Sequence, residues 1–318
     1  MQNANLSKAK NAKNDEVYTR LGDIEKELNE YDPKVFKNKS IFCNCGDQTN
    51  SNFWIFFHMN FHRLGLKKLI ATHYTSDGSP SYAMIYDSKD PKDDVDFDKG
   101  TKIPLKGDGD FRSDECIDLL KQSDMVVTNP PVSLFREYIA QLENYDKQFI
   151  VIGDKKAITY KEIFPLIKDN KLWLGYTKVN EFKQPDGTYK KFFGTKPWFT
   201  NVDTKERHRK LETVYRWYQR IAKYPDLYPK YDTYDAIEVS DVLQIPLDYD
   251  GVMGVPITFL DVYDPDQFEI IGLARDTVPK ADLSGGCLTV NGKRKYARIL
   301  IRNKHPEDYQ IIKTINDK

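Results

Sequence analysis

Short apolar runs alternate along the chain with amphipathic stretches, a pattern that is typical of proteins in which strands alternate with helices. One run, Met125-Val-Val127, has no polar residue, as expected for a strand that is buried on both faces of a sheet. Pro130 and Pro131 end the run because they remove two backbone donors that a sheet would need. Apolar residues then recur at helical spacing from Ser133 to Leu142. The stretch therefore predicts a buried strand, a rigid turn and a helix.

The same alternation repeats over the first half of the chain. Such spacing is typical of α/β proteins with a doubly wound, mostly parallel sheet, the Rossmann-like arrangement. Residues 75–100 are mostly polar and are expected to form a loop. Beyond residue 177 the pattern loosens into loops, one basic helix and isolated strands, one of which, over 255–260, would return to the sheet. The other expected elements are strands over 40–45, 66–74, 102–105, 149–153 and 172–176, and helices over 24–31, 51–61, 113–122 and 159–168.

The turn after the Met125 strand carries two hydrogen-bond acceptors. The side-chain amide of Asn129 and the backbone carbonyl of Pro130 follow the carboxyl end of the strand, where ligands bind in open α/β sheets. An exocyclic amine is a poor nucleophile because its lone pair is delocalised into the ring. Acceptors aimed at its two N–H bonds would favour the form that carries charge on nitrogen. The alternative interpretation is that Asn-Pro-Pro merely ends the strand.

Two further polar turns follow predicted strands, one from Asn44 to Asp47 and one from Gly107 to Phe111. If the strands are neighbours, these turns and the Asn129 turn converge on one crevice. Asp110 could then accept a hydrogen bond from the exocyclic amine of a purine while Phe111 packs against its ring. The alternative for the Gly-Asp-Gly-Asp sequence is a flexible acidic turn.

Composition and motifs exclude several classes of protein. The formal net charge is zero, so a polyanionic partner would have to bind a local cluster of basic residues. The four cysteines do not form a zinc ligand set, and no metal is expected. Neither a Gly-x-Gly-x-x-Gly sequence after the first strand nor a phosphate-binding P-loop is present. The polar, basic N-terminus and the absence of a long apolar run predict neither export nor membrane insertion, and hence a cytoplasmic protein.

Beyond these single features, an ordered set of segments carries a family resemblance. The chain resembles the adenine-specific DNA methyltransferases of the EcoRI modification-enzyme type. Asn-Pro-Pro alone is shared by amino-methyltransferases of many substrates, whereas the ordered set is far more specific. The set comprises segments 14–19, 43–45, 51–53, 65–71, 107–113, 128–131, 228–231, 246–260 and 298–301.

The resemblance implies S-adenosylmethionine as the methyl donor and the exocyclic N6 of adenine as the acceptor. It also implies a class I methyltransferase-like fold. By motif, the catalytic turn comprises Asn129, Pro130, Pro131 and Val132. The residues matched to cofactor binding are Tyr18, Thr19, Asn44, Asp47, Asp110 and Phe111.

Val132 departs from the pattern of related amino-methyltransferases. These enzymes usually have an aromatic residue after the second proline, which stacks on the extruded adenine. Stacking contributes about 1–3 kcal/mol per base, so its loss would weaken activity without abolishing it. A nearby aromatic side chain, Phe135, Tyr176 or Trp198, could compensate.

A base inside a duplex must be extruded before its amine can react, so the enzyme needs a surface for double-stranded DNA. Between Lys183 and Lys223 the chain has eleven Lys/Arg residues and four Asp/Glu residues. We expect a basic helix that begins at Lys205 and has an apolar face comprising Val214, Trp217, Tyr218 and Ile221, and its alternative is an ordinary solvated helix. The candidate phosphate contacts are Lys205, Arg207, Arg209, Lys210, Arg216 and Arg220.

The sequence thus predicts three parts: a mobile basic segment over 1–14, a catalytic core over 15–177, and a DNA-recognition region over 178–318 with strands that return to the core. The predicted activity is site-specific adenine methylation, and a cognate restriction endonuclease is a possible partner. Two alternatives stay open. One is an amino-methyltransferase that acts on RNA or protein, and the other is a non-catalytic homologue that binds DNA or the cofactor.

Overall fold

The computed structural model describes residues 18–46, 51–75, 78–87, 100–184, 187–277 and 288–306. The segment over 1–14 lies outside them. The chain divides into two compact units. Unit 1 comprises residues 1–163 and 172–203, and unit 2 comprises residues 164–171 and 204–318. Among the helices described, none is long and apolar enough to cross a membrane.

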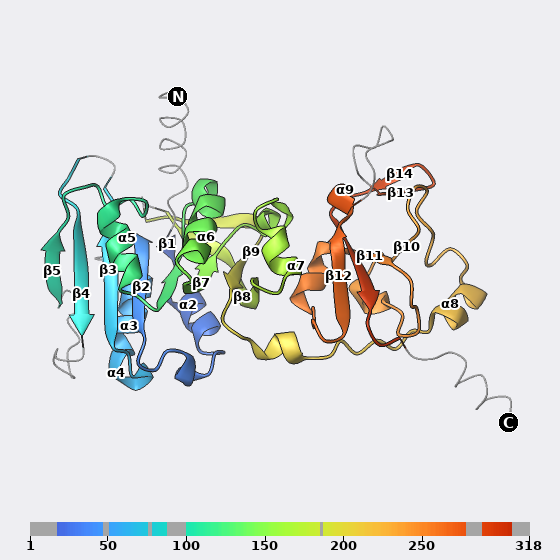
Figure 1. Cartoon of the computed structure of the whole chain (residues 1–318), viewed down its shortest axis with the longest axis horizontal. Coiled ribbons are helices and arrows are strands. Elements are labelled where there is room, and N and C mark those ends of the chain that lie inside the picture. Colours follow the sequence, from blue (N-terminus) through green and yellow to red (C-terminus); the bar gives the residue numbers. More distant parts are fainter. Residues whose placement is uncertain are drawn as a thin grey trace. The chain divides into compact units, whose positions relative to one another are not determined.

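Unit 1 is built on one large mixed sheet (Figure 1). Its strand order is β1-β8-β9-β7-β6-β2-β3-β4-β5. The four strands at its centre, β3, β2, β6 and β7, are parallel to one another, whereas the strands on either side pair antiparallel. The strands span Tyr18–Thr19 (β1), Ser40–Gly46 (β2), Lys68–His73 (β3), Tyr82–Asp87 (β4), Thr101–Pro104 (β5), Met125–Thr128 (β6), Gln148–Ile152 (β7), Trp173–Lys183 (β8) and Tyr189–Thr200 (β9).

Helices cover both faces of this sheet. Trp54 and Phe57 of α3 join a core with alternate residues of the central strands, such as Ile41 and Val127. On the other face the ring of Phe135 in α6 packs 5.1 Å from that of Phe199. Because both faces are covered, the β6 strand is fully buried, and the predicted doubly wound α/β fold is confirmed. The helices of unit 1 are α2 (Leu21–Leu28), α3 (Asn52–Met59), α4 (Phe61–Leu64), α5 (Asp114–Lys121) and α6 (Phe135–Asn144), with short 3₁₀ turns η1 (Pro33–Val35), η2 (Val132–Leu134) and η3 (Lys155–Thr159).

Two strands differ from the sequence prediction. Residues 82–87, expected in a loop, form β4, because Ala83, Met84 and Tyr86 are apolar enough to be buried when they pair with β3. The strand expected over 172–176 extends to Lys183 and forms an antiparallel hairpin with β9. Residues 178–203, which the sequence analysis assigned to the recognition region, therefore lie in unit 1.

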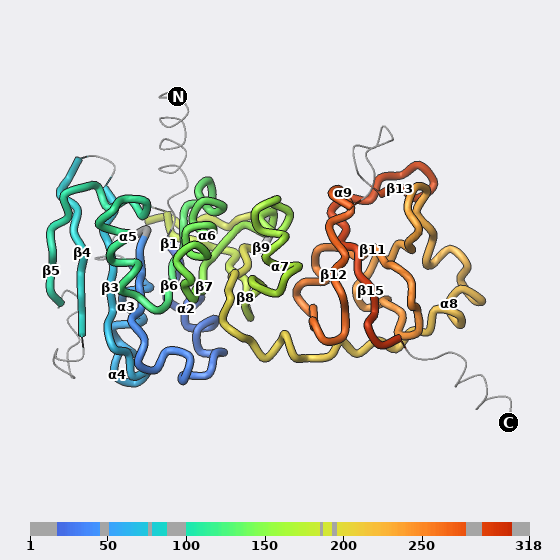
Figure 2. The backbone as a smooth tube through the Cα atoms, viewed as in Figure 1, coloured from blue at the N-terminus to red at the C-terminus, as the bar shows by residue number. Residues whose placement is uncertain are grey.

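Unit 2 has its own small sheet, whose strand order is β10-β11-β15-β12. Three of its strands, β11, β15 and β12, are labelled on the backbone trace in Figure 2. The strand expected over 255–260 is shorter, ends at Pro256 and lies in this sheet, so the expectation that it returns to the large sheet is wrong. The elements of unit 2 are α7 (Phe164–Lys168), η4 (Lys205–His208), α8 (Trp217–Lys223), β10 (Ile237–Glu238), η5 (Val242–Gln244), β11 (Met253–Pro256), η6 (Ile257–Asp261), β12 (Phe268–Leu273), α9 (Ala274–Thr277), β13 (Leu288–Val290), β14 (Lys293–Lys295) and β15 (Arg298–Asn303). One helix was expected over 159–168. The structure instead has η3, a turn over 160–163 and the shorter helix α7.

Candidate active site

The Asn129 turn follows β6 directly, at the carboxyl end of the parallel strands. Asn129 is half-buried, Pro130 is buried, and Pro131 and Val132 are half-buried. Pro131 precedes the 3₁₀ turn η2, and α6 follows. Since Thr128 pairs with Val151, the turn lies beside the end of β7. An amide and a donor-free carbonyl are thus held by two prolines at the edge of the sheet where ligands bind.

Asn44 joins the end of β2 to this turn. Its backbone carbonyl accepts a hydrogen bond from the Thr128 hydroxyl, one residue before Asn129. Its side-chain oxygen accepts a hydrogen bond from the Tyr138 hydroxyl in α6. Asn44 is itself buried. Asn44 therefore holds the start of the turn through its backbone carbonyl and α6 through its side-chain oxygen.

The Gly107–Phe111 turn also packs on α6. The Phe111 ring meets the Tyr138 ring edge to face, with centroids 5.0 Å apart, and its carbonyl accepts a hydrogen bond of 3.0 Å from Gln141. Gly109 has a φ of +83°, and a Cβ there would lie 2.2 Å from the carbonyl oxygen of His73. This position therefore requires glycine. Tyr138 therefore contacts two of the three turns, at Asn44 and at Phe111, and Asn44 is bonded to Thr128 at the start of the third.

Asp110 is bound by Arg112 of its own turn. The guanidinium donates two hydrogen bonds, of 2.9 and 2.6 Å, to the carboxylate, and the Arg112 backbone N–H donates a third of 2.8 Å. Partial burial acts to raise the pKa of Asp110, but the hydrogen bonds and charge of Arg112 outweigh it, and the pKa lies below its ordinary value. Asp110 is therefore an ionised acceptor that would share its oxygens between Arg112 and a ligand.

The N-terminal pair Tyr18 and Thr19 forms β1, an edge strand on β8. Asn52, at the start of α3, donates a hydrogen bond of 2.7 Å to the Thr19 carbonyl. The Thr19 hydroxyl is buried and has no hydrogen-bond partner within the described part of the chain. A buried hydroxyl of this kind normally has a partner, so it fits a site for a polar ligand. Asp47, matched to the same function by sequence, lies outside the described residues.

A lysine that was not predicted from the sequence lies near the carboxyl end of β7, beside the Asn129 turn. Lys196 of β9 is 7% exposed, and its ammonium lies 3.3 Å from a carboxylate oxygen of Asp154, two residues after β7. Burial acts to raise the pKa of Asp154, but the Lys156 backbone N–H and the Lys196 charge outweigh it and hold this pKa below its ordinary value. The only signal in the sequence is a lysine just before the Pro197-Trp-Phe run.

A second missed residue is Glu27 of α2, which is fully buried. The ladder between β8 and β9 is irregular between Leu174 and Lys178. Within this bulge the backbone N–H groups of Tyr176 and Thr177 donate to the Glu27 carboxylate at 2.9 and 2.6 Å. Burial raises the pKa of Glu27, and these donors only partly offset that effect. Glu27 thus replaces the missing strand partner and fixes the backbone at Tyr176.

The structure separates the three aromatic candidates that could compensate for Val132. Phe135 and Trp198 are fully buried, and so cannot present a ring to a base. Tyr176 is half-buried. Its ring packs edge to face on Tyr31, with centroids 4.9 Å apart. Of the three, Tyr176 alone keeps accessible surface.

The basic helix expected around Lys205 to Lys223 is wrong in its form. Only η4 and the short α8 are helical, and Val214, expected on an apolar face, is 75% exposed. The intervening backbone bonds to distant segments instead: Leu211 exchanges two hydrogen bonds with the Gln267 side chain, and the Asp248 side chain accepts from the Trp217 N–H. These non-local bonds replace helical ones.

The six candidate phosphate contacts therefore do not share one helical face. Lys205, Arg209 and Lys210 are exposed, whereas Arg207, Arg216 and Arg220 are half-buried. The Arg220 guanidinium stacks 3.9 Å from the centre of the Tyr215 ring. All six belong to unit 2.

The fold and the turn chemistry define a class I methyltransferase-like α/β protein, in which the Asn-Pro-Pro turn ends the buried central strand of the large sheet. The chain belongs to the family described as adenine-specific methyltransferase EcoRI, which matches residues 5–304.

Three relatives cover nearly all of the chain. It is 45% identical to the Type II methyltransferase M.EcoRI of Escherichia coli, over 94% of this chain and 96% of the relative. It is 40% identical to the Type II methyltransferase M.MpnI of Mycoplasma pneumoniae and 39% identical to the Type II methyltransferase M.MgeORF184P of Mycoplasma genitalium, each over 94% of this chain and 98% of the relative. No solved structure matches the chain.

Proposed function

We propose that this protein transfers a methyl group from S-adenosylmethionine to N6 of an adenine within a specific sequence of double-stranded DNA. Its membership of the adenine-specific methyltransferase family and the names of its three Type II methyltransferase relatives support this function. The observation that carries it is the Asn129-Pro130-Pro131 turn at the end of the buried β6 strand, bonded through Thr128 and Asn44 to the neighbouring strand.

Asn129 and Pro130 are the proposed catalytic residues. The side-chain oxygen of Asn129 and the carbonyl of Pro130 accept hydrogen bonds from the two N–H groups of the adenine amine, and so stabilise the charge that develops on nitrogen. Pro130 and Pro131 fix the direction of the carbonyl because their φ angles are restricted. These groups act through fixed electrostatics, which lower the barrier without reorganisation at the moment of transfer.

The residues around the turn fit S-adenosylmethionine as the cofactor. The group supplies an electrophilic methyl carbon when it is bound. We propose that Asp110 and Asp47 provide acceptors for it, Phe111 an apolar wall, and Thr19 its unpaired buried hydroxyl. Asn44 and Tyr18 act at this site by position: Asn44 orders the turn, and Tyr18 extends β1 along the edge of the sheet.

The adenine must leave the helix to reach the turn, and its extrusion costs stacking and pairing energy. We propose that the Tyr176 ring supports the extruded base in place of an aromatic residue at position 132. Lys205, Arg207, Arg209, Lys210, Arg216 and Arg220 are proposed as phosphate contacts. A restriction endonuclease that cuts the same sequence is the proposed cellular partner.

The test is transfer of labelled methyl groups from S-adenosylmethionine to unmethylated genomic DNA, followed by nucleoside analysis. We expect N6-methyladenine from the native chain. We expect a loss of turnover of about 10²–10³-fold in Asn129→Ala, since one preorganised electrostatic contact is removed. Calorimetry should show nearly unchanged cofactor affinity in this variant. Lys34→Gln, an exposed change in η1 before the amino end of β2, is the matched control.

Other outcomes separate the alternatives. If the methyl label appeared in RNA or protein and not in DNA, DNA would be excluded as the substrate. Cofactor binding without any product would indicate a silent homologue, and recovery of activity in Val132→Phe would then identify position 132 as the cause. Equal losses of turnover and cofactor affinity in Asn129→Ala would mean that the turn is structural.

A further inference from the structure

Unit 2 contains a basic hairpin formed by β13 and β14. Residues 288–298 include Lys293, Arg294, Lys295 and Arg298 and no acidic residue. Lys293 and Arg294 are exposed, and Tyr296, directly after β14, is 67% exposed. Lys295 and Arg298 are paired with Glu238, whereas Lys293 and Arg294 place positive charge at the surface beside an exposed aromatic ring.

The tip of the hairpin is rigidly built. Asn291 and Gly292 have φ angles of 49° and 71°, as a two-residue hairpin turn with matching twist requires. The Asp232 carboxylate accepts hydrogen bonds of 2.9 Å from the backbone N–H groups of both residues. The Asp232 N–H donates in turn to the Thr289 carbonyl at 2.9 Å. The Asp232 carboxylate therefore holds the backbone of the tip.

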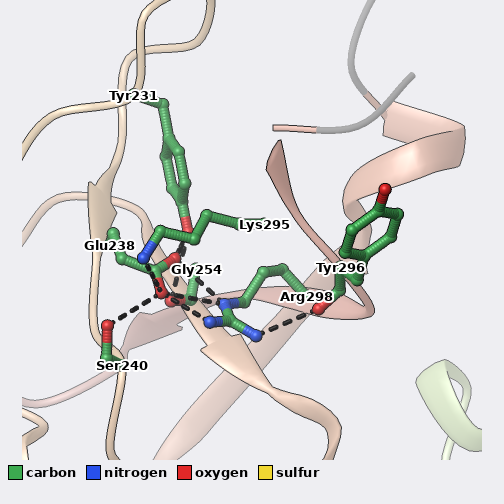
Figure 3. Close-up of polar contacts among 7 residues, drawn as sticks. All are labelled: Tyr231, Glu238, Ser240, Gly254, Lys295, Tyr296 and Arg298. Atoms are coloured by element: carbon green, nitrogen blue, oxygen red, sulfur yellow. Dashed lines mark hydrogen bonds and ion pairs between the residues drawn. The ribbon is translucent and has the colours of Figure 1, made fainter. Parts of the chain in front are cut away.

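The base of the hairpin is held by a buried ionic network (Figure 3). The fully buried Glu238 carboxylate accepts hydrogen bonds from Arg298 at 2.9 and 2.6 Å, and from the Tyr231 hydroxyl. Arg298 also donates a hydrogen bond of 3.0 Å to the carbonyl of Tyr296. The Lys295 ammonium lies 3.7 Å from Glu238. A buried ion pair contributes little net stability compared with apolar packing, and its best-attested use is to fix one arrangement of the chain.

The backbone between β14 and β15 is strained. Ala297 has a φ of 49°, in the left-handed region that residues with a Cβ rarely adopt. This residue redirects the chain from β14 into β15. Such strain persists where the surroundings determine the conformation, and here Arg298 holds the carbonyl of Tyr296 directly before it. Tyr296 is thus presented at the surface by a turn that costs free energy to make.

We infer that the β13–β14 hairpin is a DNA-contacting element of this protein. Lys293 and Arg294 bind phosphates of the duplex, and the Tyr296 ring packs against a nucleotide beside them. Duplex DNA fits because phosphates attract fixed cations, and an amphipathic ring can pack on a sugar or base. The inference rests on the proposed function in that DNA is the substrate. It adds a recognition element outside the Lys205–Arg220 segment.

The test measures binding to labelled duplex DNA over a series of salt concentrations, without turnover. In the double variant Lys293→Gln, Arg294→Gln, we expect affinity to fall by about tenfold or more at low salt, and the salt slope to decrease by about two. Lys34→Gln is again the control. Because both changed side chains are exposed, the melting temperature should not change. Equal affinity and equal slope in the double variant would overturn the inference.

Tyr296 is tested separately with two substitutions. Tyr296→Ala should weaken DNA binding by about fivefold or more, whereas Tyr296→Phe should retain most of it, since the ring provides the contact. Cofactor affinity should be unchanged in both. Retained DNA affinity in Tyr296→Ala would contradict the role of the ring. Failure of the proposed function would appear instead as native protein that binds DNA through the hairpin without forming N6-methyladenine.

Discussion

The hydroxyl of Tyr138 donates a hydrogen bond to the side-chain oxygen of Asn44, 94 residues earlier in the chain. Both residues are buried. The bond joins α6, which follows the Asn129 turn, to the end of β2. The Tyr138 ring also packs edge to face against the Phe111 ring. One side chain of α6, the helix that follows the Asn129 turn, therefore supports the other two turns of the proposed active site.

Removal of that hydroxyl tests its importance. Tyr138→Phe leaves the side-chain oxygen of Asn44 buried without this donor, so we expect the free energy of unfolding to fall by about 1–3 kcal/mol. Turnover should fall as well, because the turns lose their common support. Urea unfolding and methyl transfer check the two effects. Tyr189→Phe, at an exposed position, is the control. Unchanged stability would show that another donor replaces the hydroxyl.

Tyr176 provides a test of base support. Tyr176→Ala keeps the backbone N–H that bonds to Glu27, so the bulge in β8 should survive while the ring is lost. We expect kcat/KM for DNA to fall by about tenfold or more, and Tyr176→Phe to remain close to the native value. Steady-state kinetics with genomic DNA measures both. If the alanine and phenylalanine variants behave alike, the ring does not support the base.

Glu238 should make folding sensitive to acid. Burial acts to raise its pKa, but Arg298, Tyr231 and Ser240 outweigh it and hold the pKa below its ordinary value. A carboxylate whose pKa is lower in the folded state contributes stability above its unfolded pKa, about 4.3 for glutamate, and loses it as pH falls through the folded value. Glu238→Gln should therefore lose less stability than the native protein between pH about 5 and about 3. Urea midpoints over this range are the measurement, and parallel curves would exclude the effect.

Substitution of two glycines by alanine should change the stability of the protein in opposite directions. At Gly254 an added Cβ would lie 2.1 Å from the Tyr231 hydroxyl, so Gly254→Ala must displace the ring that donates to Glu238. At Gly22, near the start of α2, nothing lies within 4 Å, and Gly22→Ala should stabilise by about 0.5–1 kcal/mol. We expect a lower melting temperature for the first and a higher one for the second. A tolerated Gly254→Ala would mean that Tyr231 can move freely.

The large sheet was predictable where apolar runs were continuous. The Met125 strand and its Asn-Pro-Pro turn were visible because a doubly buried strand admits no polar residue and prolines end it sharply. The β8–β9 hairpin was missed since its exposed lysines interrupt the apolar pattern that Val179, Phe182 and Phe199 would otherwise show.

The rest of the site depends on contacts that have no local signature. Glu27 and Lys196 look like surface charges in the sequence, and only the strand register brings them to Tyr176 and Asp154. The basic stretch around Arg209 has helical spacing, but its backbone bonds to Gln267 and Leu247 instead. Such non-local bonds override local propensity.

The path of the chain has a practical consequence for protein engineering. Residues 164–171 belong to unit 2, although the residues on both sides of them belong to unit 1. Their helix, α7, contacts β12, which follows it by about a hundred residues in the chain. A protein truncated after residue 203 would therefore keep α7 but lose the sheet that α7 packs on. A fragment that starts at residue 204 would keep the sheet but lack α7. A transfer of unit 2 between relatives must therefore include this internal insert together with the C-terminal part, as a two-piece graft.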